Sequence, residues 1–190
     1  FEYVAGQLGM VIDVVIPAGS QPVGRGIGPV LEARDVMQVL RGEAEAPADL
    51  REHALLLAGR MLDLDPALPG GQGRRRATEL LDNGAALAAM HRLMRAQGPP
   101  PHVAVLGPLM HVITAPSAGH VSAIDCHRIA RIARVAGAPM DKGAGIDLFC
   151  KVGAKVAADQ PLYRIHAAAP AGLTYARELA AEDDGFSLLP

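Results

Sequence analysis

A short glycine-rich loop holds the residue types in this sequence that are best suited to binding an anion. Gly24-Arg25-Gly26-Ile27-Gly28 follows a β-branched run at 10–16 and precedes a helix that should begin at Pro29. Backbone N–H groups at a helix start attract anions, and an arginine can make a two-pronged contact with phosphate. Gly24, Arg25 and Gly26 are therefore the candidate phosphate-binding residues. Because the spacing matches neither common nucleotide-binding glycine motif, a ligand-free tight turn is the preferred interpretation.

Cysteine and histidine are adjacent once, at Asp125-Cys126-His127, and Cys150 is the other cysteine of the chain. Structural zinc sites usually take their ligands from two closely spaced pairs, which this arrangement does not supply. Neighbouring side chains at a helix start point apart, which argues against Cys126 and His127 as a nucleophile and its base. Asp125 suits the N-cap of the following helix. We therefore expect no metal site and assign no catalytic residue within this chain.

Three consecutive arginines, Arg74, Arg75 and Arg76, form a basic run at the start of another predicted helix. Such a run is found on some surfaces that bind phosphate or nucleic acid. More often, arginines on a helix face solvent or pair with acidic side chains three or four residues away. Glu79 and Asp82 lie close enough along the helix for such pairing. The pattern favours ion pairs on the helix surface.

Most of the first hundred residues should be helical. A first helix ends near Gly9, and the run 10–16 between Gly9 and Pro17 has the pattern of a buried strand in an α/β sheet. Proline is favoured at the first helical position and glycine just past the end. On this basis we expect helices from Pro29 to Gly42, from Pro47 into the sixties, from about Arg74 to Asp82, and from Asn83-Gly84 to Gln97.

The C-terminal half alternates short strands with one amphipathic helix. Strands are expected at 118–124 and at two places within 151–166, where glycine and proline interrupt any helix. A helix over 126–136 carries an apolar stripe made by Ile129, Ile132, Ala133 and Ala136. A last short helix is expected at about 173–181. These elements indicate a small α+β unit.

Gly98-Pro99-Pro100-Pro101 is the clearest linker, because three prolines cannot continue a helix. It divides the chain into two expected domains, 1–97 and 98–190. The predicted fold class is α+β, with an α/β remnant before the linker and a β-rich module after it.

Composition excludes several classes of protein. The chain has 190 residues, a formal net charge of −2 and 3% aromatic residues, which disfavours nucleic-acid binding by charge or by base stacking. It contains no run of 18 apolar residues and no signal peptide, so no membrane partner is expected. Two separated cysteines fit a reducing cytoplasm better than a disulfide scaffold. The chain starts without methionine inside a helical pattern, which we interpret as a piece of a longer protein.

The segment 151–162, Lys-Val-Gly-Ala-Lys-Val-Ala-Ala-Asp-Gln-Pro-Leu, resembles the turn-and-strand signature of biotinyl/lipoyl-type barrel-sandwich modules. It has no lysine between two methionines at a hairpin tip, so a swinging-arm carrier is not expected. Together with Ala118-Gly119-His120-Val121 and 137–146, it resembles the C-terminal domain of the pyrimidine-nucleoside and AMP phosphorylases. Residues 20–42 and 81–84 are similar to further segments of that family, so the resemblance covers nearly the whole chain in order.

The resemblance implies a pentosyltransferase in which inorganic phosphate attacks the anomeric carbon of a nucleoside and the base departs. It identifies 1–97 as the C-terminal part of the α/β catalytic domain and 98–190 as a barrel-sandwich or α-β hammerhead-like C-terminal module. It also implies a homodimeric parent that uses a nucleoside or nucleotide and phosphate, with no cofactor. The family's Lys-x-Ser-x-Gly-Gly and Gly-His-Thr-Gly-Gly motifs have no counterpart in this chain. No catalytic residue can therefore be carried over, and the chain alone is expected to be inactive.

Several functions remain open on the sequence. Thymidine phosphorylase is the first interpretation, and an AMP phosphorylase is the alternative. Residues 137–146 look more like the AMP phosphorylase branch of the family, which also includes bacterial thymidine phosphorylase-like proteins. A non-catalytic binding or scaffold module is the alternative from another class. A phosphoribosyltransferase shares the α/β architecture according to the resemblance, but is not expected to carry this C-terminal β module.

Overall fold

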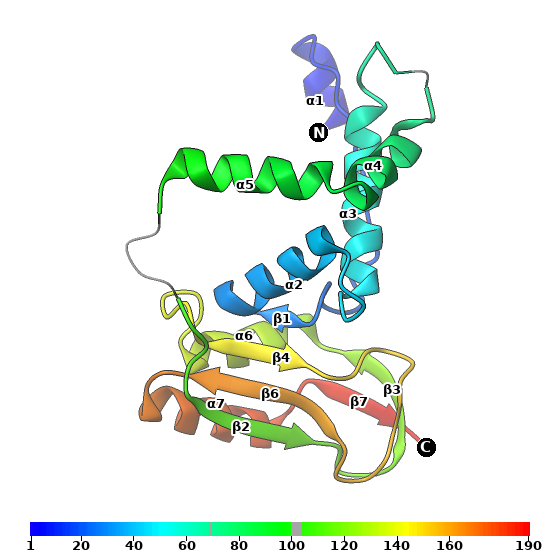
Figure 1. Ribbon diagram of the computed structural model, residues 1–190. Helices are drawn as coiled ribbons and strands as arrows, with labels where there is room; N and C mark the ends of the chain where they lie inside the picture. The colour runs from blue at the N-terminus through cyan, green and yellow to red at the C-terminus, as the bar shows by residue number, and fades with distance from the viewer. Residues whose placement is uncertain (69, 100–103) are drawn as a thin grey trace.

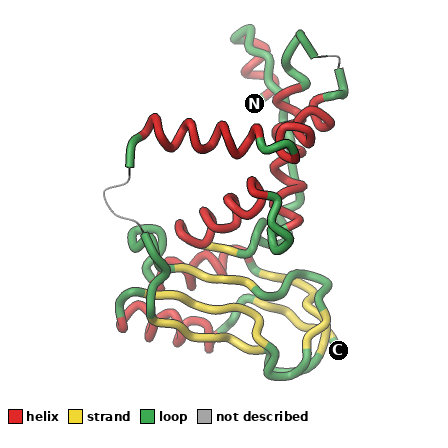
Figure 2. Tube along the Cα trace, in the orientation of Figure 1, coloured by secondary structure: helices red, strands yellow, loops and turns green. Residues whose placement is uncertain are grey.

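The computed structural model describes residues 1–68, 70–99 and 104–190, and these residues form a mixed α+β structure (Figure 1 and Figure 2). The fold class predicted from sequence is confirmed. The expected linker, Gly98–Pro101, lies partly outside the described residues. The helices are α1 (Glu2–Gln7), α2 (Pro29–Arg41), α3 (Ala48–Leu62), α4 (Gly73–Asp82), α5 (Ala85–Gln97), α6 (Cys126–Ala136) and α7 (Pro170–Glu182). The strands are β1 (Gly26–Ile27), β2 (Leu109–Thr114), β3 (Gly119–Ile124), β4 (Gly145–Leu148), β5 (Lys155–Val156), β6 (Pro161–Ala167) and β7 (Phe186–Leu189).

Two antiparallel sheets organise the second half of the chain. The larger has the strand order β1-β4-β6-β2, and the smaller has the order β5-β3-β7. Helices α6 and α7 pack together and against the larger sheet, α6 on β4 and β6 and α7 on β6 and β2 (Figure 1). In the same view α3, α4 and α5 extend away from the sheets, and α2 lies between them and β1.

The main hydrophobic core lies in this β-rich half. Ile132, Ile146, Leu162, Tyr163 and Ile165 have no exposed surface. Tyr163 stacks on Phe186 of β7 with ring centroids 5.8 Å apart. Burial, followed by the nearby Asp184 charge, raises the pKa of the Tyr163 phenol. Burial of the larger side chains stabilises such a unit by about 1.5–3 kcal/mol each.

Helix α6 shows why local sequence patterns predict this half well. The Asp125 side chain accepts hydrogen bonds from the backbone N–H groups of His127 and Arg128 at 2.9 and 3.0 Å. These bonds satisfy two of the free donors at the helix start, so the predicted N-cap is confirmed. All four residues of the predicted apolar stripe are buried. Gly137, with φ of 129°, follows the last helical residue.

The larger sheet takes its first strand from the N-terminal half of the chain. Gly26 and Ile27 of β1 pair with Asp147 and Ile146 of β4. The glycine loop is therefore hydrogen-bonded into the same sheet as the C-terminal strands. The proposed division at residues 97 and 98 stays a prediction, and these backbone contacts cross it.

The strand expected at 10–16 is not formed. Val11 and Ile16 are 85% and 91% exposed, and no strand of the described residues pairs with the segment. A strand requires neighbours for its backbone hydrogen bonds, and this one lacks them.

The helices expected around the segment 10–16 are confirmed within a few residues at their ends. Within the described ranges, each helix is either too short or too polar to cross a bilayer.

His166 on β6 makes the stability of this fold depend on pH. The side chain is 3% exposed, and its Nδ1 lies 3.5 Å from the carbonyl oxygen of Gly107. Burial lowers the His166 pKa, against smaller opposing effects of Gly107 and Asp147. The folded state therefore binds this proton less readily than the unfolded state, whose histidine pKa is about 6.5. The resulting loss of stability is absent above pH ~6.5 and grows as pH falls below it.

Replacing His166 by phenylalanine should reduce the acid sensitivity of folding. Between pH 7 and 5, the free energy of unfolding of the wild type should fall more steeply than that of His166→Phe, by up to about 1.4 kcal/mol per pH unit. Urea unfolding at several pH values measures both slopes. His120→Phe, at an exposed position of β3, is the matched control and should keep the wild-type slope. Equal slopes for wild type and His166→Phe would contradict the assignment.

Candidate functional site

The glycine loop folds around carboxylates of the same chain. The backbone N–H groups of Arg25 and Gly26 donate to Oδ2 of Asp35 at 2.6 and 2.7 Å. The N–H of Gly24 donates to Oδ2 of Asp49 at 3.2 Å. Asp35 lies on α2 and is 1% exposed, and Asp49 lies in the first turn of α3. The loop therefore has the donor geometry of an anion site, and side-chain carboxylates already occupy it.

This arrangement bears directly on the phosphate site predicted at Gly24, Arg25 and Gly26. All three N–H groups point at protein carboxylates, so phosphate would have to compete with Asp35 and Asp49 for the same donors. The Arg25 guanidinium donates from Nη2 to Gln38 at 2.8 Å, and its buried Nε has no hydrogen-bond partner among the described residues. Phosphate binding at these residues stays a prediction.

Close packing explains why glycine recurs in this loop. A Cβ on Gly26 would lie 2.5 Å from the backbone carbon of Leu31, and one on Gly28 would lie 2.4 Å from the carbonyl oxygen of Ala144. The opposing Gly145 is equally constrained, because its Cβ would lie 2.1 Å from the carbonyl oxygen of Ile27. Glycine at 28 and 145 lets the loop approach the β4 backbone closely enough to pair with it, and Gly26 lets the loop pack against the first turn of α2.

An arginine of α2 links the loop to the C-terminal sheet. Arg34 donates from Nη1 and Nη2 to the two carboxylate oxygens of Asp147 at 2.8 and 2.7 Å, and it donates to Oδ1 of Asp35 at 2.8 Å. These contacts, with the hydrogen bond to Asp147 the largest, raise the Arg34 pKa although burial opposes them. Paired hydrogen bonds of this kind fix direction as well as distance. Arg34 therefore sets how α2 lies on β4.

The contacts of the glycine loop and α2 with β4 form the junction between the two halves of the chain. Lys151 makes a second link across this junction. Its ammonium donates to the carbonyl oxygen of Pro22 at 2.6 Å, to Oδ2 of Asp49 at 2.9 Å and to the carbonyl oxygen of Gly24. Burial acts to raise the Asp49 pKa, but Lys151, with the N–H groups of Leu50 and Gly24, lowers it overall. One cation thus joins the loop, the start of α3 and the segment after β4.

An open groove of about 430 Å³ lies beside this junction. Its walls come from the segment before the loop, from one face of α3 and from the start of α4. Both charges and apolar groups line it, so its chemistry is mixed. The lining residues are Pro17, Ala18, Ser20, Gln21, Pro22, Val23, Asp49, Glu52, His53, Leu56 and Arg74.

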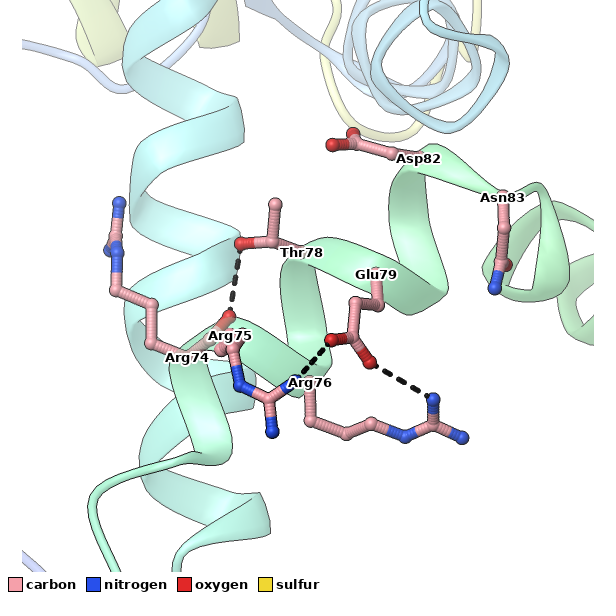
Figure 3. A pocket seen from close by; sticks show the side chains of 7 residues that line it. All are labelled: Arg74, Arg75, Arg76, Thr78, Glu79, Asp82 and Asn83. Carbon is pink, nitrogen blue, oxygen red and sulfur yellow. Dashed lines mark hydrogen bonds and ion pairs between the residues drawn. The ribbon is translucent and has the colours of Figure 1, made fainter.

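The three arginines of α4 form ion pairs. Arg75 and Arg76 both contact Glu79, at 2.6 and 3.3 Å (Figure 3). Arg74 pairs with Glu52 of α3. The expected pairing with Glu79 is confirmed. The expected partner Asp82 pairs instead with Arg51 of α3 at 2.6 Å, because α3 packs directly on α4. This face of α4 is a charge-paired surface that borders an open hollow.

The cysteine and histidine cluster does not form a metal centre. In the described ranges, no three or more of the His, Cys, Asp and Glu side chains come close enough to hold a metal ion. Asp125 caps α6, and Cys150 is buried, which raises the pKa of its thiol. Neither cysteine forms a disulfide.

Sequence reasoning found the loop but missed the side chains that hold it. Asp35, Arg34 and Asp49 sit at ordinary helical positions, and Asp147 and Lys151 lie more than a hundred residues away from their partners. A glycine loop followed by an aspartate one or two helical turns later is the one local signal, since such a carboxylate can reach back to the loop.

Comparison with known proteins finds similarity to a nucleoside phosphorylase family within the C-terminal half. Residues 120–183 match the family described as "Pyrimidine nucleoside phosphorylase C-terminal domain". A protein of Nitrobacter hamburgensis named "Putative thymidine phosphorylase" is 54% identical over 181 residues, which are 95% of this chain and 35% of that protein. Proteins of the same name from Rhodopseudomonas palustris and Methylococcus capsulatus are 52% and 50% identical over 99% of this chain. The chain spans little more than a third of the length of these curated relatives.

Gly26→Ala tests whether the loop glycine is required for packing. Its new Cβ would overlap the Leu31 backbone, and such overpacking costs about 1–3 kcal/mol. Gly19→Ala, where no atom lies within 4 Å of the new Cβ, is the matched control and should change stability by less than about 0.5 kcal/mol. Chemical denaturation gives both values. The packing explanation fails if the two variants are equally stable.

Lys151→Met should loosen the junction, because it removes the ammonium group and keeps an unbranched side chain. Asp49 is 38% exposed, so solvent screens part of the pair, and we expect a loss of about 1–2 kcal/mol. In the variant the Asp49 pKa should rise, which NMR titration of its carboxyl carbon measures. Lys155→Met, at an exposed position of β5, is the control. An unchanged Asp49 pKa in Lys151→Met would exclude the proposed link.

Proposed function

We propose that the whole chain is the C-terminal part of a nucleoside phosphorylase, since residues 120–183 match the pyrimidine nucleoside phosphorylase C-terminal domain family. The observation that carries the proposal is the sequence identity of about half over nearly the entire chain to proteins named "Putative thymidine phosphorylase". The parent enzyme transfers a pentosyl group from a nucleoside to inorganic phosphate. Thymidine is the proposed substrate, giving thymine and 2-deoxyribose 1-phosphate.

The chemistry of this transfer sets what the rest of the parent enzyme must supply. Phosphate forms a bond to the anomeric carbon while the bond from that carbon to the base breaks, and the base leaves with the bonding electrons. Such a reaction needs phosphate held in line and a group that stabilises the departing base. We assign no residue of this chain to either task. Apart from phosphate as co-substrate, no cofactor is proposed, and the parent is proposed to be a cytoplasmic homodimer.

The exposed surface of the first residues supports a role within a larger enzyme. Val11 and Ile16, together with Met61 of α3, are each more than 70% exposed. Large apolar groups that cluster on a surface mark contact sites for other polypeptide. We propose that these exposed side chains contact the catalytic region of the parent enzyme.

The chain's own contribution is proposed to be positional. The C-terminal domain would lie against the catalytic region, and the loop-centred junction would hold the two at a fixed orientation. Arg34 and Lys151 are the residues that make this junction rigid, since each bridges elements from both halves of the chain.

A chimaera tests the proposal. The part of the Nitrobacter hamburgensis relative that this chain does not match is joined to the chain, and phosphate-dependent base release is measured from thymidine, uridine, AMP and CMP. We expect release by the chimaera and none by the chain alone. Preference for AMP over thymidine would identify the alternative, an AMP phosphorylase. Near-ultraviolet circular dichroism establishes that each protein is folded.

Two results would contradict the proposal. Base release by the chain alone would place catalytic residues within it. A folded chimaera without activity toward any of the four substrates would favour a non-catalytic binding or scaffold module.

Ile16→Lys should reduce base release by the chimaera, because its side chain would lie in the contact with the catalytic region. Met140→Lys, at a residue 89% exposed in the turn between α6 and β4, is the matched control and should remain active.

A further inference from the structure

A groove lined by both polar and apolar side chains lies between helix α7 and the edge strand β2. In Figure 1, β2 and β1, the strand of the glycine loop, lie at opposite edges of the larger sheet. The groove has a volume of about 330 Å³, a size that accommodates a small ligand. The lining residues are His111, Ile113, Thr174, Arg177, Glu178 and Ala181. They come from only two elements, so the geometry follows from strand and helix periodicity.

The periodicity of each element explains why these side chains converge. In β2, alternate residues point to the same face, and His111 and Ile113 are on the half-buried face of the strand. In α7, Thr174, Arg177, Glu178 and Ala181 follow the spacing of one helical face. Because α7 packs on β2 and β6, that face borders the strand.

The polar groups of the groove are not committed to other contacts. At the end of α7, Glu182 and Asp183 pair with Arg128 of α6. By contrast, the side chains of Thr174, Arg177 and Glu178 make no hydrogen bond or ion pair with any of the described residues. Burial and the nearby Arg177 charge both lower the His111 pKa.

We propose that this groove binds a phosphoryl group, with Arg177, His111 and Thr174 as its donors. A guanidinium offers parallel N–H groups that match two phosphate oxygens. The imidazole N–H and the threonine hydroxyl supply two more donors from the opposite wall and the helix. Glu178 is the one carboxylate among the lining residues and suits either a phosphate hydroxyl or a hydroxyl of an attached sugar. Ile113 and Ala181 provide the small apolar wall.

NMR titration of the 190-residue chain tests the site without any requirement for catalysis. Inorganic phosphate, ribose 5-phosphate and ribose are added separately at constant ionic strength, and the signals of the His111 ring and the Arg177 Nε–H are followed. Inorganic phosphate and ribose 5-phosphate should both shift these signals, and ribose should not. A tighter fit of ribose 5-phosphate identifies a sugar phosphate as the ligand, and equal affinities identify free phosphate.

Variants separate recognition from general attraction of anions. Arg177→Ala and His111→Gln should each weaken binding of ribose 5-phosphate by about tenfold or more, which corresponds to loss of one charge-assisted hydrogen bond. Arg131→Ala, which removes an exposed arginine of α6, should leave the affinity unchanged. Urea unfolding establishes that each variant is folded. The proposal is wrong if neither phosphorylated probe shifts the signals, if acetate shifts them equally, or if Arg177→Ala binds as tightly as wild type.

Discussion

One buried carboxylate governs the junction between the two halves of this chain. Asp35 is 1% exposed, and an ionised carboxylate at such a position is costly unless donors surround it. Two N–H groups of the glycine loop bind one oxygen of Asp35, and Arg34 binds the other. The shape of the loop and the direction of Arg34 both follow from this requirement. Since Arg34 also holds Asp147, the same constraint extends into the C-terminal sheet.

This constraint changes how the glycine loop is understood. A glycine-rich turn before a helix predicts an anion site, and the structure contains one in which the anion is part of the protein. The donors that would hold a phosphate instead fix α2 and β1 against β4. The loop thus joins α2 and α3 to the C-terminal sheet. The remaining groove beside it is lined by both charged and apolar groups.

Local patterns predicted much of the fold because they act through near neighbours. The Asp125 cap, the apolar stripe of α6 and the proline and glycine ends of α2 depend on residues within about one or two helical turns. The strands β2, β4 and β7 were not among the predicted strands, since their pairing depends on distant partners. The segment 10–16 shows the opposite error, because its β-branched sequence favours a strand but no strand in the described part of the chain pairs with it.

The side chains of the site were less predictable for the same reason. Arg34 and Asp147 are 113 residues apart, and Lys151 and Asp49 are 102 residues apart. Nothing in the local spacing of either residue identifies its partner. The resemblance of the chain to the phosphorylases, by contrast, could be recognised from the sequence. The match of residues 120–183, with relatives that align over 95% and 99% of the chain, confirms it. It did not reveal which charges join the segments.

A double-mutant cycle on Arg34 and Asp147 tests the central claim most directly. The free energies of unfolding are measured for Arg34→Met, Asp147→Asn, the double variant and wild type. If this ion pair joins α2 to the C-terminal sheet, the two substitutions should be coupled by about 1.5–3 kcal/mol, because residues in one charge-assisted network are not additive. Additive effects, with a coupling below about 0.5 kcal/mol, would show that the halves are held together by something else.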